Sequence, residues 1–465
     1  MDYEKPWNPS SNLQFPIAIR NIVYQTFRFR PLKKLGRTYY QMTAKKIGKV
    51  LQSIASSSKV FLTGAEEELF IPGISELNFL IVKDREIRER EIWDLRTEYF
   101  EIKRKFPMMG DLNVTCSSDL KRLESSASAS SNWFSDRKKL SHDNWKSSKP
   151  KESIPAQLSS QLALSVHYFS KAQKYLISSR RKSSAFYRIQ FLKYIGRTLF
   201  LCSGENLESL NLQTPAVLMA HAYYQIQQLA ERAHEEQRPN KLDFKLNFRE
   251  KKGARFGAEI LNRGWVYKLR KIEPSFTMLR ASSCPLVLVP QSNLTLVSAV
   301  NIFSHFVALF SSFDEEPKEV PLIVSPATLV LLSSGWHWGN TFSHLNWAYP
   351  AQVEDNDWLK HCRFATHYRL KESLLLGRNL IIGNLISQSP ENIHRTLKDF
   401  TRLSLIAKAK ENLSDLDLIN KFEQQYPNTT QLFELLIKKQ QPINLQSLVR
   451  GTLNVLKEGQ SALYS

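Results

Sequence analysis

The stretch 60–82 limits the possible folds of this chain more than any other segment. An apolar run ends in the turn Gly64-Ala65, and a second apolar run begins twelve residues after Gly64. This second run starts with alternating polar and apolar residues, with Glu76 and Asn78 two positions apart. Because side chains at i and i+2 of a strand share one face, we expect Glu76 and Asn78 to point the same way. The segment therefore predicts two strands joined by a turn, with two polar side chains on one face.

Asp111 is the third polar residue of interest, 35 positions after Glu76. Apolar residues at helical spacing predict a helix at about 37–57 before the first strand and another at about 85–104 after the second. A short strand follows at 111–116. Strand–helix–strand order implies a crossover connection, so we expect Asp111 to lie at one end of a small sheet together with Glu76 and its neighbour at i+2.

This layout resembles the signature of the polymerase β-like nucleotidyltransferases: an apolar strand, a Gly-Ser turn, a short helix, and then Ser-Asp-x-Asp before further apolar residues. The resemblance implies that Glu76, Asn78 and Asp111 form the catalytic site, with Glu76 and Asp111 binding Mg²⁺. It also implies that the nucleotide-binding residues are Gly64, Ala65 and Ser75, with backbone amides facing a phosphate. The implied activity is transfer of a nucleoside monophosphate from an NTP to an acceptor hydroxyl.

Three positions depart from that family pattern. Ala65 replaces the usual Ser, Glu76 replaces the first Asp, and Asn78 replaces the second. One unit charge lost beside a cation is worth about 4 kcal/mol at about 4 Å with an effective dielectric of about 20. Two interpretations stay open: a Mg²⁺-dependent nucleotidyltransferase, and a catalytically inactive relative (a pseudoenzyme) that binds a nucleotide, RNA or a protein. An ordinary strand–turn–strand without a site is the remaining alternative.

The net charge of +20 and the pI near 9.6 favour a polyanionic partner such as nucleic acid or nucleotide. Solvated lysine faces are the alternative, because the positive charge is scattered. Four distant cysteines without a CxxC pair indicate a reducing compartment, so we expect a cytoplasmic protein. We expect no secretory signal at the N-terminus. We also expect no membrane span, since prolines and polar residues interrupt the uncharged stretch 281–313.

The fold class predicted for the whole chain is α+β. The expected order is a basic lead-in at 1–36, a nucleotidyltransferase-like domain with a mixed sheet at 37–120, a Ser/Lys-rich loop or linker at 121–156, a helical region at 157–235, a smaller mixed α/β segment at 236–390 and C-terminal helices at 391–465. In the mixed segment, two short strands flank a helix at 293–311. A second, decayed copy of the first topology is one possible explanation, although no motif supports it.

Overall fold

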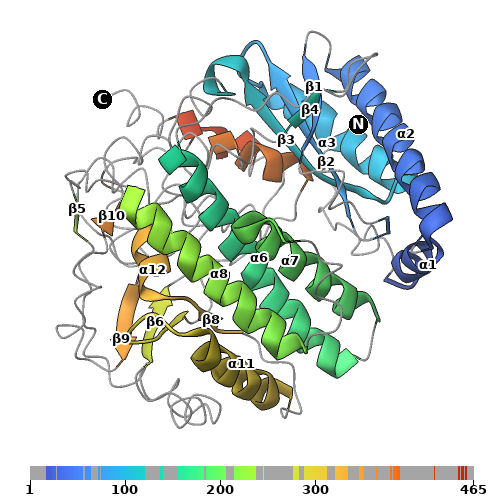
Figure 1. The fold of residues 1–465 in the computed structure, drawn as a ribbon. Helices are drawn as coiled ribbons and strands as arrows, with labels where there is room; N and C mark the ends of the chain where they lie inside the picture. The colour runs from blue at the N-terminus through green and yellow to red at the C-terminus, as the bar shows by residue number, and fades with distance from the viewer. Residues whose placement is uncertain are drawn as a thin grey trace. The chain divides into compact units, whose positions relative to one another are not determined.

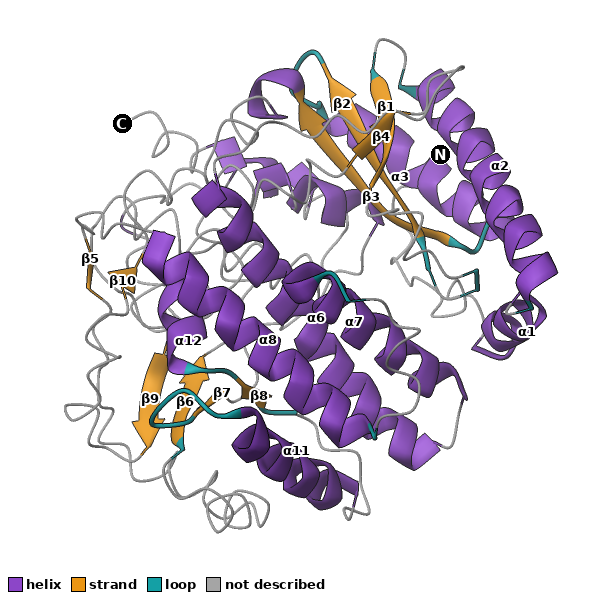
Figure 2. Cartoon of the chain, viewed as in Figure 1, coloured by secondary structure: helices purple, strands orange, loops and turns teal. Residues whose placement is uncertain are grey.

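The computed structural model describes the chain in segments. These are residues 17–27, 29–55, 58–63, 72–73, 75–120, 137–139, 154–182, 185–205, 214–236, 244–245, 276–281, 287–311, 320–332, 345–349, 363–364, 378–379, 381–387, 424, 449–450, 452–454 and 456–457. They form helices and small mixed sheets, so the fold is α+β, as the sequence predicts (Figure 2).

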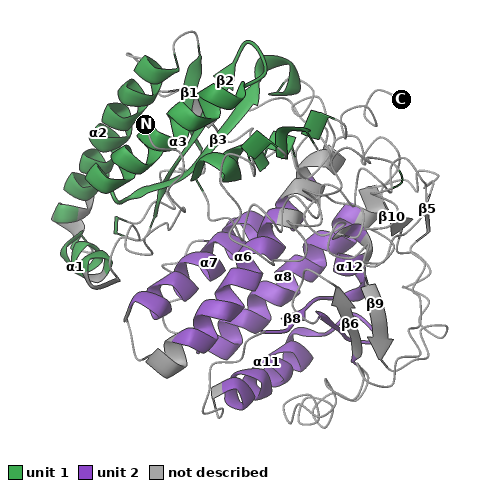
Figure 3. Ribbon diagram, turned by 180° about the vertical axis from the view of Figure 1, so that it is seen from behind, with its two compact units in different colours: residues 1–126, 130–151, 370–465 green, residues 127–129, 152–369 purple. Residues whose placement is uncertain are grey.

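The chain divides into two compact units, which we describe one at a time (Figure 3). Unit 1 combines residues 1–126, 130–151 and 370–465, and unit 2 combines residues 127–129 and 152–369. This division differs from the domains expected from sequence. Residues 370–465 group with the N-terminal elements. The sequence analysis did not predict this grouping, because contacts between distant parts of the chain leave no mark in local sequence patterns.

Unit 1 is built on a four-stranded sheet. Its labelled elements are α1 (Ile17–Phe27), α2 (Arg30–Ile54), β1 (Lys59–Thr63), β2 (Leu77–Lys83), α3 (Glu89–Lys105), β3 (Met109–Cys116) and β4 (Arg137–Lys139). The strand order is β3-β2-β1-β4, with β2 and β3 parallel and the other two pairs antiparallel (Figure 1). Helix α3 makes the crossover between the parallel strands, as the strand–helix–strand pattern predicts.

The core of unit 1 forms where one face of α2 meets the sheet. Ala44, Ile47 and Leu51 recur at helical spacing and are fully buried. In the sheet, Phe79 and Leu80 of β2 are also fully buried. Each large aliphatic or aromatic side chain buried in this way contributes roughly 1.5–3 kcal/mol. The polar residues at the start of β2 therefore lie next to a well-packed hydrophobic core.

Part of the segment expected to be a loop or linker at 121–156 has regular structure. Strand β4 lies in it and pairs with β1, with Phe61 opposite Lys139 and Thr63 opposite Arg137. The edge of β1 exposes backbone N–H and C=O groups that need hydrogen-bond partners. A polar strand can supply these partners.

A helical segment from near the other end of the chain completes unit 1. The Arg96 guanidinium on α3 donates a hydrogen bond to the Leu385 carbonyl, 2.5 Å away and 289 positions along the chain. Leu385 belongs to the helical residues 381–387, and its carbonyl lies in the last turn, where acceptors need partners. Burial lowers the pKa of Arg96 to about 10, so its charge is kept at neutral pH. Most of the helices expected at 391–465 lie outside the described residues.

Unit 2 contains a helical layer and a second four-stranded sheet. Its labelled elements are α6 (Ile154–Lys182), α7 (Ala185–Ser203), α8 (Pro215–Glu236), β5 (Phe244–Lys245), β6 (Thr277–Ala281), β7 (Val287–Val289), α11 (Leu296–Ser311), β8 (Leu322–Ile323), α12 (Pro326–Leu332), β9 (Leu345–Tyr349) and β10 (Arg363–Phe364). The rings of Phe169, Tyr223 and Phe303 pack together where α6, α8 and α11 meet. Strands β5 and β10 form a separate antiparallel pair.

The two four-stranded sheets have the same topology. The order β8-β7-β6-β9 in unit 2 repeats β3-β2-β1-β4 in unit 1. In both sheets the first two strands are antiparallel, a helix crosses over to a third, parallel strand, and the fourth strand pairs antiparallel with the first. Neither β7 nor β8 contains an acid, whereas β3 contains Asp111. A second copy that lacks the polar site fits this observation.

One observation bears on membranes. None of the helices within the described ranges is both long enough and apolar enough to cross a bilayer.

Candidate functional site

Three polar residues meet where β2 begins. Glu76 immediately precedes β2, Asn78 is its second residue, and Asp111 lies on the neighbouring strand β3. The register shifts between β2 and β3 at this point, because Leu77 pairs with Met109 whereas Phe79 pairs with Leu112. Two residues of β3 therefore face Asn78, a bulge that keeps the flanking apolar pairs buried. Asp111 is exposed as a result.

The bulge is held by a hydrogen bond between the strands. The backbone N–H of Asp111 donates to Asn78 Oδ1 at 2.9 Å. Gly110 makes this approach possible, since a Cβ at that position would overlap Asn78 Oδ1 and lie 2.9 Å from the Glu76 Cβ. The side chains of Glu76 and Asn78 are thus both packed against the backbone just before Asp111.

A cation from the N-terminal helix reaches Glu76. Arg20 on α1 forms an ion pair with the Glu76 carboxylate at 2.5 Å. Helix α1 can lie this close because Gly73 has a φ of 81° and carries no side chain. A Cβ on Gly73 would lie 2.7 Å from the Arg20 carbonyl oxygen. The Tyr40 hydroxyl accepts the Gly73 N–H at 2.8 Å and fixes the turn from α2.

A second cation approaches the site from α3. The Tyr99 hydroxyl donates to the Gly110 carbonyl at 2.9 Å, and Lys103 Nζ donates to the Tyr99 hydroxyl at 2.9 Å. Burial lowers the pKa of Lys103, and the nearby Glu76 and Asp111 carboxylates offset part of that effect. Burial and the same two carboxylates raise the pKa of Tyr99. The two acids and the two cations, Arg20 and Lys103, therefore form one electrostatic cluster.

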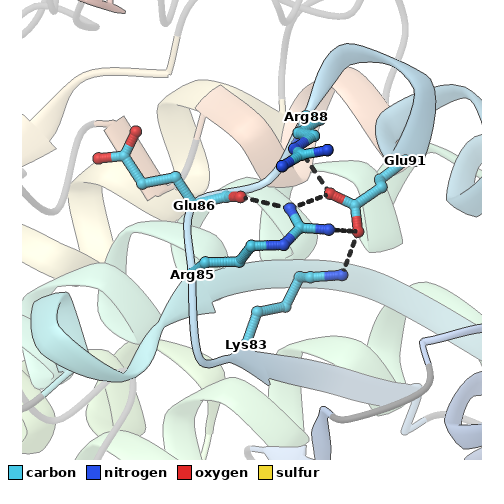
Figure 4. A network of polar contacts seen from close by, with 5 residues as sticks. All are labelled: Lys83, Arg85, Glu86, Arg88 and Glu91. Carbon is cyan, nitrogen blue, oxygen red and sulfur yellow. Dashed lines mark hydrogen bonds and ion pairs between the residues drawn. The ribbon is translucent and has the colours of Figure 1, made fainter.

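A separate polar network lies at the opposite end of β2 (Figure 4). Glu91, in the first turn of α3, accepts hydrogen bonds from Lys83 Nζ at 2.5 Å, from the Arg85 guanidinium at 2.8 and 3.0 Å, and from the Arg88 N–H at 2.9 Å. Burial alone would raise the pKa of Glu91, but the bonds from Arg85, Lys83 and the Arg88 backbone lower it to about 2. This network ties β2 to α3 and fixes the crossover helix.

The structure brings together Glu76, Asn78 and Asp111, the three residues predicted to be catalytic. Ser75 is buried ahead of β2, whereas Gly64 and Ala65 lie outside the described residues. The residues that surround the three are Arg20, Tyr99, Lys103 and Gly110. Sequence reasoning placed Arg20 in the basic lead-in at 1–36 and assigned no site role to the other three. Gly110 had a usable signal, because it directly precedes Asp111, but Lys103 resembles every other basic residue of its helix.

Within the described residues, the donor set is too small for a three-carboxylate metal cage. Glu76 and Asp111 are the acids that these residues supply at the site, Glu76 is paired with Arg20, and the Asn78 oxygen accepts a backbone N–H. Across the described part of the chain, no three His, Cys, Asp or Glu side chains gather as a metal site would require. These residues therefore do not fit the two-metal arrangement that the family resemblance implies.

Comparison with known proteins finds no relative of this chain. No protein-family model matches the chain, and neither curated proteins nor solved structures give a match. The function must therefore be argued from the chemistry of the cluster around Glu76, Asn78 and Asp111.

Proposed function

We propose that this protein is a catalytically inactive relative of the polymerase β-like nucleotidyltransferases that keeps a nucleotide-binding site. One observation carries the proposal: a Glu76 carboxylate oxygen and Asn78 Oδ1, two of the oxygens at the predicted catalytic site, already have partners within the chain. Arg20 forms an ion pair with Glu76 at 2.5 Å, and the Asp111 N–H donates a hydrogen bond to Asn78 Oδ1 at 2.9 Å. With one acid replaced by an amide, transition-state charge in phosphoryl transfer would lack several kcal/mol of stabilisation.

The same cluster can bind phosphate through its cations. The Glu76 side chain is 46% exposed and the Arg20 side chain 14% exposed, so the ion pair opens to solvent on its carboxylate side. A nucleotide phosphate carries more charge than one carboxylate and accepts two parallel hydrogen bonds from a guanidinium, so it can replace Glu76 at Arg20. Lys103 supplies a second positive charge from the α3 side.

Metal-dependent nucleotidyl transfer is the second candidate function. It is favoured by the exposure of both Glu76 and Asp111 on adjacent segments, close to the same Gly110 backbone. A metal ion delivered with the nucleotide could compete with Arg20 for Glu76. The two candidates differ in whether Mg²⁺ is required.

Isothermal titration of the whole protein with ATP, CTP, GTP and UTP, each with and without Mg²⁺, separates them. The proposal expects binding of at least one nucleotide without Mg²⁺, weakened by about tenfold in Arg20→Gln through loss of a charge-assisted contact. Arg104→Gln is the control, because Arg104 is likewise paired with a glutamate, Glu101, at 3.0 Å; its side chain is 66% exposed, against 14% for Arg20.

Four results would contradict the proposal. Binding that appears only with Mg²⁺ and disappears in Glu76→Gln favours the transferase, as does release of pyrophosphate in the presence of an acceptor. Failure to bind any of the four nucleotides removes the nucleotide-binding part. Binding of RNA that weakens steeply with salt, without nucleotide binding, assigns the basic surface to nucleic acid instead.

A further inference from the structure

Exposed apolar side chains concentrate on the two N-terminal helices. Among the described residues, seven of the nine large hydrophobic side chains that face solvent lie between residues 19 and 50. They are Ile19, Ile22, Phe29, Leu35, Tyr39, Met42 and Val50. Single exposed hydrophobic residues need no explanation, but a contiguous group of them marks an interaction surface.

The residues on α2 form a continuous ridge. Leu35, Tyr39 and Met42 follow one another at i, i+4 and i+7, and Val50 lies two turns further on the same side. We call these four residues the α2 ridge. Tyr39 is 52% exposed and Met42 is 66% exposed, whereas the opposite side of α2 is buried on the sheet. A helix with 25 residues extends about 37 Å, so the ridge is long and straight.

The charge around the ridge has one sign. Residues 17–54 contain nine Lys or Arg and no Asp or Glu. Lys34, Lys45, Lys46 and Lys49 are exposed and follow the ridge along α2. In both overall views, α2 lies at the edge of unit 1, with the sheet on its inner side (Figures 1 and 3).

We propose that the α2 ridge binds an anionic lipid surface, with its apolar side chains at the headgroup boundary and its lysines on lipid phosphates. Amphipathic helices that lie in the membrane interface combine these two features. A second copy of this chain would place like charges against each other. Single-stranded nucleic acid stacks its bases on several aromatic side chains, whereas Tyr39 is the one aromatic residue of the ridge.

Flotation of the full chain with vesicles tests the proposal. One set contains phosphatidylcholine alone, and the other contains equal parts of phosphatidylcholine and phosphatidylglycerol. We expect binding to the anionic set only, and weaker binding as salt increases. Tyr39→Ser with Met42→Ser, and separately Lys45→Glu with Lys49→Glu, should each reduce binding by roughly tenfold or more.

Matched controls remove similar groups elsewhere. Leu296→Ser with Val297→Ser deletes exposed apolar side chains on α11, and Lys174→Glu reverses an exposed charge on α6. Both should leave vesicle binding unchanged, and circular dichroism should report native helix content for every variant.

Two results would overturn the lipid assignment. The first is that the wild-type protein does not bind anionic vesicles, or that it binds both sets of vesicles equally. The other is loss of single-stranded polyuridylate binding in the ridge variants without any loss of vesicle binding, which would assign the surface to RNA.

Discussion

Asn78 and Asp111 are joined across β2 and β3 by a hydrogen bond from the Asp111 N–H to Asn78 Oδ1, 2.9 Å long. The bond uses the side chain of one residue and the backbone of the other. An aspartate at position 78 could accept the same N–H and would add a negative charge beside two existing carboxylates. The amide therefore keeps the geometry of the site while reducing its charge.

Restoring the charge should create metal dependence. We expect Asn78→Asp to lower the stability of metal-free unit 1 by roughly 1–2 kcal/mol, because it adds like charge next to Glu76 and Asp111. Mg²⁺ should then raise the melting temperature of the variant and leave the wild type unchanged. Thermal unfolding with and without Mg²⁺ measures this, and Asn301→Asp on α11 controls for added charge. Equal Mg²⁺ responses in the wild type and the variant would contradict our interpretation of the site.

Gly110 should not tolerate a side chain. Gly110→Ala places a methyl group against Asn78 Oδ1 and 2.9 Å from the Glu76 Cβ, so the Asn78 side chain must move. We expect a loss of about 1–3 kcal/mol, as for other overpacked sites. Hydrogen exchange of the β2 and β3 amides reports the loss. Removing the amide as well, in Asn78→Ala with Gly110→Ala, should recover part of it, and a purely additive double variant would argue against the clash.

Two buried tyrosines should respond differently to loss of the hydroxyl. The Tyr99 hydroxyl bonds to the Gly110 carbonyl and to Lys103, so Tyr99→Phe should cost about 1–3 kcal/mol. The Tyr223 hydroxyl is buried with no hydrogen-bond partner among the described residues, so Tyr223→Phe should leave stability unchanged or raise it. Denaturant unfolding followed by hydrogen exchange in each unit compares the pair. Similar losses in both variants would contradict the assigned contacts.

Glu91 should make the α3 region sensitive to acid. Its pKa falls from 4.5 to about 2 on folding, so its stabilising contribution is complete above about pH 4.5 and is lost as the pH falls through 2. At about 1.4 kcal/mol per pKa unit, that contribution is at most about 3.5 kcal/mol. Glu91→Gln should increase exchange of the first α3 amides at neutral pH, and the difference from wild type should vanish near pH 2.

The control for Glu91 lies on the same helix. Glu101→Gln removes an exposed carboxylate paired with Arg104, a contact of the surface type that contributes little. Its exchange should follow the wild type at every pH. An acid response as large as that of the Glu91 variant would mean that general charge, rather than the Glu91 network, sets the behaviour.

Local periodicity was enough to predict the central elements of unit 1. The sequence predicts a strand at 59–63, and β1 spans Lys59–Thr63; it also predicts the crossover helix that became α3. The spacing of Glu76 and Asn78 likewise predicts that they share a strand segment. These features depend on neighbours in the chain, which is why a repeat of two or 3.6 residues reveals them.

The surroundings of the site could not be predicted in the same way. Arg20 meets Glu76 across 56 positions, and Arg96 meets Leu385 across 289. The bulge opposite Asn78 depends on how two strands fit together, and no property of either strand alone specifies it. Strand β4 was missed because its three residues are all basic and have no apolar alternation.

The contact between Arg96 and Leu385 has a consequence for how the protein is made. On the ribosome, Arg96 of α3 is synthesised long before Leu385, the residue whose carbonyl it contacts. Leu385 follows only after the whole of residues 152–369. Unit 2 is nearly continuous in the chain, so it can fold cotranslationally while the earlier segment still waits for residues 381–387. The middle of the nascent polypeptide would then reach its native state before the part that was translated first.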